Sequence, residues 1–342
     1  MEIAVSSCSG SYKIIVERGL LKKVASYVAD GRRALVITDD GVPIRFFEEL
    51  STGGGEIYLH TVERGEGAKS LRVFEEITAR LVELGFARDD YIIALGGGVV
   101  IDLSGFVASC YMRGIRYISV PTTTMAQLDV SVGGKCALNF SGYKNMIGAF
   151  YPPEIVLIDP DTLNTLPSRH YNSGLVESLK AGLLGDEELF KMYEALDEDG
   201  IRSNIDEIIK RALLFKKTIV EKDERDKGNR AILNFGHTLG HALESIYGLS
   251  GMLHGECVAA GMIALIMDEG LKKRVWQVIS KLGIPCDDGC DWESAIEAVR
   301  YDKKRTGDTV RVITLYGLCD YKIEKWTIER LKEAAVKGAN RR

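Results

Sequence analysis

Three of the chain's five histidines lie in one short stretch, NFGHTLGHALESIYGLSGMLHGE, at residues 234–256. His237 and His241 are four residues apart, and on a helix this spacing places both rings on one face, about one turn apart. His254 follows a turn-rich break at residues 247–251. Imidazoles are common ligands of divalent metals, so the cluster predicts a metal site that takes further ligands from elsewhere in the chain. The alternative is that these are ordinary surface or hydrogen-bonded core histidines.

A carboxylate and an ammonium group lie together in a second segment, SRHYNSGLVESLKAGLL, at residues 168–184. Glu177 and Lys180 are three residues apart and therefore share one face of the predicted helix. Leucine and valine residues surround them, so we expect that face to be at least half covered. A covered carboxylate needs a partner, and a metal is one. The alternative is a surface ion pair, which contributes little to stability.

A glycine run, Gly96–Gly97–Gly98, stands where an apolar strand gives way to a helix. Glycines in such a turn let backbone N–H groups approach a phosphate, and the helix N-terminus favours its negative charge. The run is not the G-x-G-x-x-G fingerprint, and a plain tight turn is the alternative. Asp102, just inside the helix, is either an N-terminal helix charge or a contact to a ribose or nicotinamide.

The segment VPTTTMAQLDVSVGGKCALNFSGYKNMIGAFYPP, residues 120–153, is dense in glycines and polar groups. It contains Asp129, Lys135, Lys144 and Asn145. We predict a long glycine-rich loop, whose cations would suit anion binding. A solvated loop without a ligand is the alternative.

The elements that must position these groups follow two patterns. In the first part of the chain, apolar strands alternate with helices, which is typical of parallel βαβ units. Strands are expected at 12–16, 33–38, 57–59, 91–95, 117–120 and 155–158, and helices at 19–29, 71–84 and 105–111. Later the pattern is helix upon helix, with one strand at 310–316. We predict a Rossmann-like α/β domain with a doubly wound, mainly parallel sheet over residues 1–160, and a mainly α-helical domain over residues 161–342.

Composition excludes several classes of function. A length of 342 residues is enough for two domains with full-sized cores. The net charge of −5 gives no electrostatic case for binding nucleic acid or an anionic membrane. We expect no transmembrane span, because the apolar runs are too short, and no secretory signal, because the N-terminal residues lack a basic start followed by an apolar core. The seven cysteines are scattered without a C-x-x-C pair, which favours reduced thiols and a cytoplasmic location.

Taken together, these segments resemble the 3-dehydroquinate synthase family in their motifs and in the order of those motifs. GEGAK at residues 65–69 resembles the family's G-E-x-x-K, and GGGVVIDLSGFVASCYMRG resembles G-G-G-V-x-G-D-x-x-G-F-x-A-x-x-Y-x-R-G. PTTTMAQLDVSVGGKCALN, GYKNMIGAFYPP, GLVESLKAGLL, NFGHTLGHALE and LHGE are also similar to family motifs. Ile101 stands where the family has glycine, and we expect it to tighten the pocket near the nicotinamide. Val130 and Cys136 replace a serine and a threonine, with no inferred catalytic polar group lost.

The resemblance implies a set of metal and cofactor residues. One divalent ion, zinc or cobalt, would be held by Glu177, His237 and His254. The family places His241 beside the metal, among the groups that contact the substrate and relay protons, whereas helical spacing alone would make it a ligand. NAD would lie along the residues Asp39, Glu66, Lys69, Gly96, Gly97, Gly98, Asp102, Thr122, Thr123, Lys144 and Thr165.

The resemblance also implies a small-molecule substrate that carries a carboxylate and a phosphate. The cations that match the family's pattern are Lys135, Lys180, Lys216, Arg230 and one of Lys303 or Lys304. Asp129, Asn145 and Asn234 would hold hydroxyl groups and orient their neighbours. Arg113 would reach the phosphate from a neighbouring subunit, which implies a homodimer.

The implied reaction converts 3-deoxy-D-arabino-heptulosonate 7-phosphate to 3-dehydroquinate and phosphate, a carbon–oxygen lyase step of the shikimate pathway to the aromatic amino acids. NAD would take up a hydride and return it, with phosphate elimination between these steps, and an aldol closure would form the ring. The site would be a closed cleft between the two domains.

The alternatives are a sister sugar-phosphate cyclase acting on sedoheptulose 7-phosphate or glucose 6-phosphate, a metal-dependent alcohol or glycerol dehydrogenase, and a non-catalytic metal-binding module. Lys216, Arg230 and Asn234 resemble the family's carboxylate-binding set and favour the heptulosonate.

Overall fold

The computed structural model describes residues 1–7, 10–226, 228–247, 251–285, 290–303 and 309–339, and for 300–303 and 338–339 it describes the backbone alone. The chain divides by its internal contacts into two compact units. Unit 1 comprises Met1–Pro167 and Lys216–Arg225, and unit 2 comprises Ser168–Phe215 and Asp226–Arg342. The chain thus returns once to unit 1, within helix α7 (Ile205–Lys222). The predicted division at a single point near residue 160 does not include this return. No helix among the described residues is long and apolar enough to cross a membrane.

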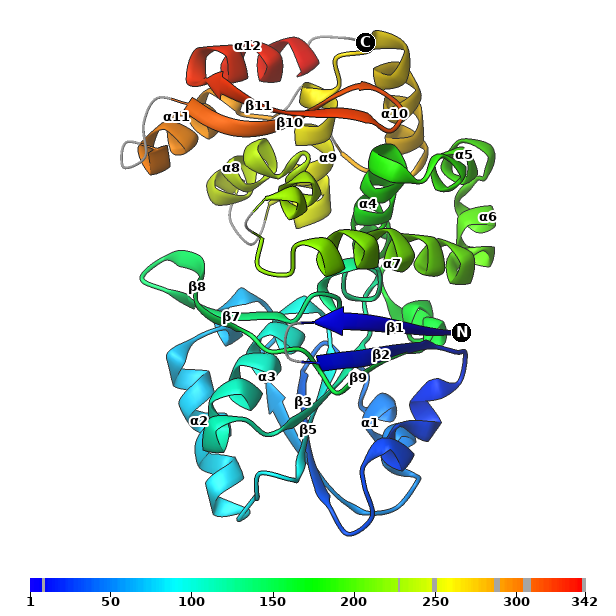
Figure 1. Ribbon diagram of the computed structural model, residues 1–342, viewed down its shortest axis with the longest axis vertical. Helices are drawn as coiled ribbons and strands as arrows, with labels where there is room; N and C mark the ends of the chain where they lie inside the picture. The colour runs from blue at the N-terminus through cyan, green and yellow to red at the C-terminus, as the bar shows by residue number, and fades with distance from the viewer. Residues whose placement is uncertain (8–9, 227, 248–250, 286–289, 304–308, 340–342) are drawn as a thin grey trace. The chain divides into compact units, whose positions relative to one another are not determined.

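Seven strands form the main sheet of unit 1, in the order β1-β2-β9-β6-β5-β3-β4 (Figure 1). Strands β1 and β2 pair antiparallel, and every other pair is parallel. The doubly wound, mainly parallel sheet is therefore confirmed, with β1 as an added edge strand. The bounds of the strands are β1 (Glu2–Ser7), β2 (Gly10–Val16), β3 (Arg33–Asp39), β4 (Glu56–Val62), β5 (Tyr91–Gly96), β6 (Arg116–Pro121) and β9 (Ile155–Ile158).

Helices cover both faces of this sheet (Figure 1). Successive residues of β3 alternate between two apolar cores, with Leu35 and Ile37 in one and Ala34 and Val36 in the other. Because side chains alternate along a strand, a sheet covered on both faces needs apolar residues at every position. This explains the continuous apolar runs in the sequence. The covering helices are α2 (Leu71–Glu83) and α3 (Gly98–Cys110) on one face, and the 3-10 helix η1 (Leu20–Tyr27) and α1 (Ile44–Ser51) on the other.

The direction of winding reverses between β3 and β5. Strand β4 lies outside β3, while β6 and β9 extend the sheet from β5 in the other direction. Strand β3 ends at Asp39 and β5 ends at Gly96. Ligands of open α/β sheets bind at the carboxyl ends of the strands at such a switch point. The fold therefore places two of the predicted cofactor-binding features at the edge of the sheet where a ligand is expected.

The polar segment at residues 120–153 is not a long loop, so that prediction is wrong. It forms the π-helical turn η4 (Ala126–Val130) and the hairpin of β7 (Lys135–Phe140) and β8 (Tyr143–Phe150). In β7, Cys136 and Leu138 are buried in the core against α3. Strand β8 is largely exposed, so burial does not impose a regular alternation of apolar and polar residues on it.

Unit 2 is mainly helical, as predicted, and holds one small antiparallel ribbon (Figure 1). The expected strand at 310–316 is β10 (Thr309–Gly317), which pairs with β11 (Asp320–Thr327), a strand that the sequence analysis did not predict. The helices are α4 (Ser168–Gly185), α5 (Glu187–Ala195), α6 (Glu198–Ser203), the first part of α7, the 3-10 helix η6 (Asn229–Asn234), α8 (His237–Tyr247), α9 (His254–Leu265), α10 (Glu269–Lys281), α11 (Trp292–Lys303) and α12 (Ile328–Ala339).

Helix α9 forms the centre of unit 2, because every residue after its first is buried. A helix that is apolar on all sides must be surrounded by other elements, and α4, α8 and α12 contact α9. Glycines set the separation of these helices. A Cβ atom added to Gly261 would lie 2.1 Å from the carbonyl oxygen of Gly236, and one added to Gly255 would lie 1.9 Å from that of Ser173 in α4. These backbones therefore approach more closely than any side chain would allow.

Candidate functional site

The three predicted metal ligands meet in unit 2. Glu177 lies in the middle of α4, His237 is the first residue of α8, and His254 is the first residue of α9. The Nε2 atom of His237 lies 3.6 Å from Oε1 of Glu177, and Nε2 of His254 lies 3.8 Å from the same oxygen. Ligands of a tetrahedral zinc ion, with bonds of about 2.1 Å, stand about 3.4 Å apart. The spacing of these three atoms fits one shared metal ion.

Glu177 is a buried carboxylate whose oxygens accept no hydrogen bond from the described residues. Its side chain is 3% exposed, and the equally buried ammonium group of Lys180 pairs with Oε2 in ion-pair geometry. The Nζ atom of Lys180 also donates to the carbonyl oxygen of Leu233 at 2.6 Å. A buried carboxylate oxygen without a partner is costly, and a cation at Oε1 would remove that cost. The predicted covering of the Glu177–Lys180 face is confirmed.

In His237 and His254, the ring nitrogen that does not face Glu177 lies near an oxygen acceptor. The Nδ1 atom of His237 lies 3.1 Å from the carbonyl oxygen of Phe235, and Nδ1 of His254 lies 3.4 Å from Oε2 of Glu244. With the proton of each neutral ring on Nδ1, the Nε2 lone pair is left for a metal. Both rings therefore direct a ligand atom toward Oε1 of Glu177.

The two rings differ in their electrostatic surroundings. Burial lowers the pKa of His237 well below its usual value, and the charge of Lys180 lowers it further. His237 is therefore neutral at physiological pH, as a metal ligand must be. Burial also disfavours the charged form of His254, but the hydrogen bond to Glu244 and the charge of Glu177 outweigh it and raise the pKa of His254. A proton thus competes with a metal more strongly at His254 than at His237.

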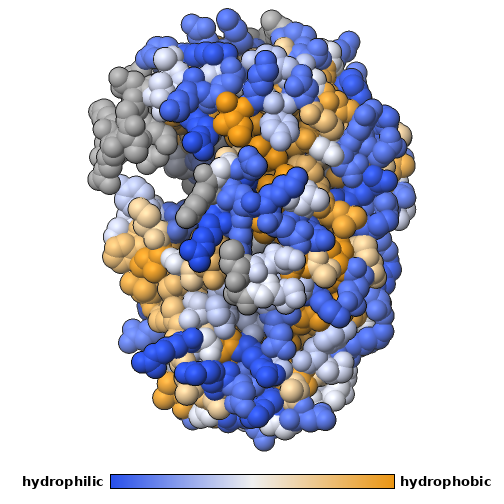
Figure 2. Space-filling model, viewed as in Figure 1, coloured by the Kyte–Doolittle hydropathy of each residue, from blue (hydrophilic) through white to orange (hydrophobic). Residues whose placement is uncertain are grey.

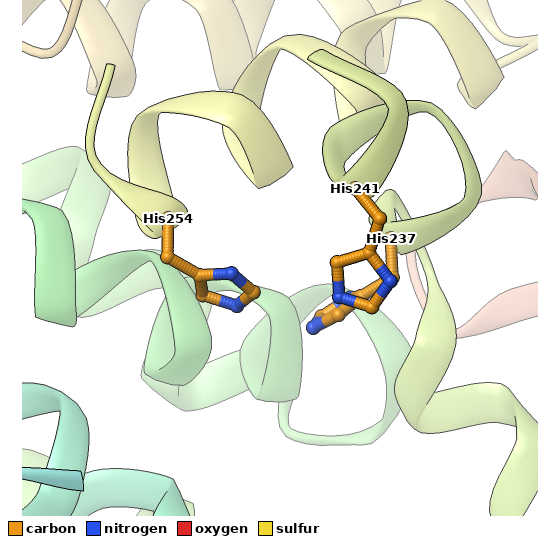
Figure 3. A group of neighbouring side chains, drawn as sticks. All are labelled: His237, His241 and His254. Carbon is orange, nitrogen blue, oxygen red and sulfur yellow. The ribbon is translucent and has the colours of Figure 1, made fainter. Parts of the chain in front are cut away.

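His241 completes a group of three imidazoles that turn toward a shared space (Figure 3). Its ring centroid lies 5.2 Å from that of His237 and 5.7 Å from that of His254. Each ring has one nitrogen atom that lies within 4.8 Å of a nitrogen atom in both of the other rings. The predicted helical spacing of His237 and His241 is thus realised, and the arrangement suits either a fourth ligand or a proton carrier beside the metal.

The remaining predicted residues of unit 2 have different surroundings. Arg230 is buried in η6, and Asn234 is exposed at the end of the same turn. Lys303 is the last residue of α11 and is described by its backbone alone, and Lys304 lies outside the described residues. The structure therefore places Arg230 and Asn234 on one short turn, a few residues before His237.

A cavity of ≈ 360 Å³ lies at the carboxyl end of β3 in unit 1. The Oδ1 atom of Asp39 accepts a hydrogen bond from the backbone nitrogen of Gly41 at 2.9 Å, and burial raises the pKa of Asp39. A carboxylate at the end of a strand in this class of sheet suits the hydroxyl groups of a ribose. The cavity is lined by Thr38, Asp39, Asp40, Gly41, Val42, Pro43, Ile44, Phe47, Thr61 and Leu95.

Lys69 joins two predicted site residues in unit 1. It is buried, and its Nζ atom donates to Oδ2 of Asp102 at 2.7 Å and to Oδ1 of Asn145. Burial raises the pKa of Asp102, and the charge of Lys69 opposes this rise. Helix α3, which carries Asp102, has Gly97 as its N-cap without a side-chain capping bond. Its first N–H groups therefore suit a phosphate, as predicted from the glycine run.

Asn139, which the sequence analysis did not single out, links two of these predicted residues. Its Nδ2 atom donates to Oε2 of Glu66 at 2.8 Å, and its Oδ1 atom accepts from the backbone nitrogen of Asn145 at 2.9 Å. Asn145 has a positive φ of 55°, which asparagine tolerates better than most residues. The sequence signal for this contact is a hairpin at residues 135–150. Pairing of its two strands places Asn139 across from the segment that carries Asn145.

Asp129 and Lys216 form a pair in unit 1 although they are 87 residues apart in the sequence. The Nζ atom of Lys216 lies 2.7 Å from Oδ1 of Asp129 and donates to its carbonyl oxygen at 2.6 Å. Lys216 is buried, and this contact places a carboxylate beside its ammonium group. Lys135 and Lys144, in contrast, are exposed on the β7–β8 hairpin.

Two of the three predicted cofactor threonines adjoin the glycine run. The backbone nitrogen of Thr122 donates to the carbonyl oxygen of Gly96 at 2.9 Å, and a Cβ atom on Gly97 would lie 3.2 Å from Cγ2 of Thr123. Thr165 lies in the 3-10 helix η5 (Pro160–Thr165), where its hydroxyl donates to the carbonyl oxygen of Thr162.

Ile101 lies in the first turn of α3, just after the glycine run. Its side chain is buried in the apolar core of unit 1, and the hydroxyl of Tyr117 donates to its carbonyl oxygen at 3.2 Å. Core packing therefore accommodates the added bulk relative to glycine, and the effect of Ile101 on a pocket near the nicotinamide stays a prediction.

Arg113 is exposed on the 3-10 turn η3 (Tyr111–Arg113). Met112 and Arg113 have positive φ angles of 48° and 67°, which are uncommon for residues other than glycine. Arg88 holds the turn through two hydrogen bonds, of 3.1 and 2.9 Å, to the carbonyl oxygen of Met112. Strained backbone of this kind collects at functional sites.

Sequence models of one family match most of the chain. The model described as 3-dehydroquinate synthase N-terminal matches residues 59–173, and the model described as 3-dehydroquinate synthase C-terminal matches residues 174–305. A 3-dehydroquinate synthase of Streptococcus mutans is 39% identical, over 97% of this chain and 99% of that protein. One of Clostridium perfringens is 40% identical, over 93% of this chain and 96% of that protein.

Solved structures of cyclases share the whole fold. A 2-deoxy-scyllo-inosose synthase complexed with carbaglucose-6-phosphate, NAD+ and Co2+ has a TM-score of 0.89 and 25% identity, over 99% of this chain and 100% of that one. A 2-epi-5-epi-valiolone synthase from Streptomyces hygroscopicus subsp. jinggangensis, with NAD+ and Zn2+ bound, has a TM-score of 0.84 and 27% identity, over 96% of both chains. An iron-containing alcohol dehydrogenase from Thermococcus thioreducens, at 17% identity and a TM-score of 0.70, shares the fold alone.

Proposed function

The chain belongs to the 3-dehydroquinate synthase family, and from that premise we propose how its residues convert 3-deoxy-D-arabino-heptulosonate 7-phosphate to 3-dehydroquinate and phosphate. Unit 1 binds NAD, and unit 2 binds one zinc or cobalt ion through Glu177, His237 and His254. The reaction is a phosphate-eliminating carbon–oxygen lyase step. We also propose a cytoplasmic location, which the free state of the cysteines in the described part of the chain supports.

The observation that carries this proposal is the convergence at Glu177. Its buried Oε1 faces the Nε2 atoms of two imidazoles, from two other helices, at 3.6 and 3.8 Å. Three protein ligands leave a coordination position for substrate oxygens, as a catalytic metal site requires. The relatives named as 3-dehydroquinate synthases reach 39–40% identity, against 25–27% for the solved sister cyclases.

The chain's own residues bind the substrate and move its protons. When bound, the metal acts as a Lewis acid on substrate oxygens, and NAD takes up and returns a hydride. Lys180, held between Glu177 and the carbonyl oxygen of Leu233, supplies a fixed positive charge for a substrate oxygen. His241 is placed to carry a proton beside the metal. Arg230 offers a bidentate contact to the carboxylate of the substrate.

The purified protein is expected to release phosphate from the heptulosonate only when NAD and a divalent metal are both present. Because NAD is regenerated in each turnover, absorbance at the NADH wavelength should show no net increase while phosphate accumulates. Phosphate is measured colorimetrically, and 3-dehydroquinate by mass spectrometry. Net formation of NADH from glycerol or another simple polyol would instead identify a dehydrogenase.

The same assay separates the sister cyclases. Sedoheptulose 7-phosphate and glucose 6-phosphate lack the carboxylate that Lys216, Arg230 and Asn234 are proposed to bind. They serve as matched control substrates under identical metal and NAD concentrations. Phosphate release from either one at the rate seen with the heptulosonate would contradict the proposed substrate.

We further propose that the protein is a homodimer that uses an apolar surface of unit 1. The β7–β8 hairpin exposes Phe140, Tyr143, Met146 and Phe150, and Figure 2 shows apolar colour over this hairpin. Helix α2 adds an outer groove whose most exposed apolar residue is Val82, at 65%. Exposed apolar side chains gathered on one element in this way are typical of interaction sites. Glu75 and Glu83 line this groove, and Arg72 and Arg80 of the same helix pair with Glu76 and Glu83. A second copy would therefore meet charged groups of both signs along α2.

A mixed dimer tests whether Arg113 serves the partner's site. Arg113→Ala and His237→Ala homodimers should each be inactive, the first for lack of the phosphate contact and the second for lack of metal. If Arg113 acts in the neighbouring subunit, a heterodimer of the two variants holds one intact site, and its activity should return to about half that of the wild type. Heterodimers are isolated with two affinity tags. A heterodimer as inactive as its parents would contradict the exchange of Arg113 between subunits.

A further inference from the structure

The two imidazoles proposed to bind the metal are oriented by different groups. The Nδ1 atom of His237 lies 3.1 Å from a neutral acceptor, the carbonyl oxygen of Phe235. The Nδ1 atom of His254 lies 3.4 Å from a charged acceptor, Oε2 of Glu244. This distance is at the long end for a hydrogen bond, and the opposite ring nitrogen, Nε2, is the one that faces Glu177. Glu244 therefore contacts the ring on the side away from the proposed metal.

Glu244 approaches His254 from another helix. It lies on α8, seven residues after His237 and three after His241, and this spacing places all three on one face of that helix. His254 begins α9, which packs closely against α8. The side chain of Glu244 is 16% exposed, so its carboxylate is partly removed from water and its interaction with the ring is less screened than at the surface. The contact thus joins the two helices that carry the proposed imidazole ligands.

A carboxylate in this place has two physical effects on the ring. Accepting from Nδ1–H, it fixes the tautomer that leaves Nε2 free, and it restricts rotation of the ring. It also increases the electron density at Nε2 and thereby strengthens a bond from Nε2 to a cation. A neutral carbonyl group, as at His237, supplies mainly the first effect. The backbone of His254 is held separately, because the buried Glu256 accepts from the backbone nitrogen of Leu253 at 2.7 Å and pairs with Arg169.

We propose that Glu244 is a positioning residue that orients His254 and strengthens its bond to the metal. This inference rests on the proposed metal site and assigns a role to a residue outside the ligand set. In this role Glu244 is not itself a ligand, and it acts through the imidazole of His254. Its loss should therefore lower metal affinity without unfolding the metal-free protein.

The test measures zinc and cobalt affinity of the metal-free protein by competition with a chelator. Glu244→Ala is expected to weaken binding by about 10- to 100-fold, the range found for outer-shell partners of metal-bound histidines. Glu244→Gln keeps a hydrogen-bond acceptor without the charge and should fall between Ala and wild type. Ser245→Ala is the matched control on the same helix, because the hydroxyl of Ser245 bonds only to the carbonyl oxygen of Ala242 among the described contacts. This control should bind metal as the wild type does.

A double-mutant cycle identifies the route of the effect. If Glu244 acts through His254, then Glu244→Ala should cause no further loss of affinity in a His254→Ala background. The visible spectrum of the cobalt-loaded Glu244→Ala protein should also differ from that of the wild type, since the ligand field at the metal changes. A Glu244→Ala or Glu244→Gln protein with wild-type affinity, or an undiminished loss in the His254→Ala background, would overturn the inference and leave the proposed function standing. A wild-type protein that binds neither metal would overturn both.

Discussion

His237→Ala is expected to lose bound metal and turnover together. The substitution removes one of the three proposed ligand atoms, and burial and the charge of Lys180 lower the pKa of this imidazole, which favours its neutral, metal-binding form. The loss of metal affinity should exceed the roughly 100-fold upper range for an outer-shell partner, because a direct bond to the metal is lost. Metal content is measured by elemental analysis after gel filtration, and turnover by phosphate release.

The control for this prediction is His170→Ala. His170 is exposed on α4, the helix that also carries Glu177, and it lies outside the histidine cluster. This variant should retain metal and activity. Circular dichroism should show the fold of both variants to be that of the wild type. A His237→Ala protein with one tightly bound metal per chain would remove His237 from the ligand set and would favour a site built on His241.

Gly255→Ala should destabilise unit 2 by at least about 3 kcal/mol, the upper end of the usual cost of overpacking. The added methyl group would lie 1.9 Å from the carbonyl oxygen of Ser173 and 2.7 Å from its carbonyl carbon, and backbone atoms cannot move aside as a flexible side chain can. Helix α9 would have to shift away from α4. Because His254 is the preceding residue and Glu177 lies on α4, the ligand atoms would separate, and metal affinity should fall with stability.

Denaturant titration of the metal-free proteins measures the change in the free energy of unfolding. Gly317→Ala is the matched control in the same unit, since a Cβ atom there would meet only Cβ of Asp320, at an ordinary contact distance of 3.7 Å. Its effect should stay within about 0.5 kcal/mol. If Gly255→Ala unfolds at the wild-type denaturant concentration and binds metal normally, the close approach of α4 and α9 is not what positions the ligands.

The parallel strands of unit 1 could be predicted from the sequence because both faces of the sheet are covered. Strands β3 and β5 must then be apolar at nearly every position, and short apolar runs are visible without any knowledge of their partners. The β7–β8 hairpin could not be predicted in the same way. Only one face of β7 is covered and β8 is largely exposed, so the residues of the hairpin follow no clear apolar–polar alternation and predict a loop instead. The helix expected at residues 19–29 forms, but as the 3-10 helix η1.

The groups of the candidate site differ in how far local spacing could place them. His237 and His241 share one face of α8 because four residues make about one helical turn, and this depends on nothing outside the helix. The approach of Glu177 to His237 and His254 depends on how α4, α8 and α9 pack. The contacts of Lys216 with Asp129, of Asn139 with Glu66 and of Glu244 with His254 also cross between elements.

Side-chain types and local periodicity are properties of neighbouring residues, so the kinds of chemistry available and many of the strands and helices follow from the order of residues alone. Which of these groups meet depends on how the helices pack. Gly255 permits α9 to approach the backbone of α4, and Gly261 permits it to approach Gly236, just before α8, at distances that a methyl group would prevent. This close packing accompanies the approach of one carboxylate and two imidazoles to the spacing of a single ion. Such convergence is a property of the packed helices together, so no single segment of the chain reveals it.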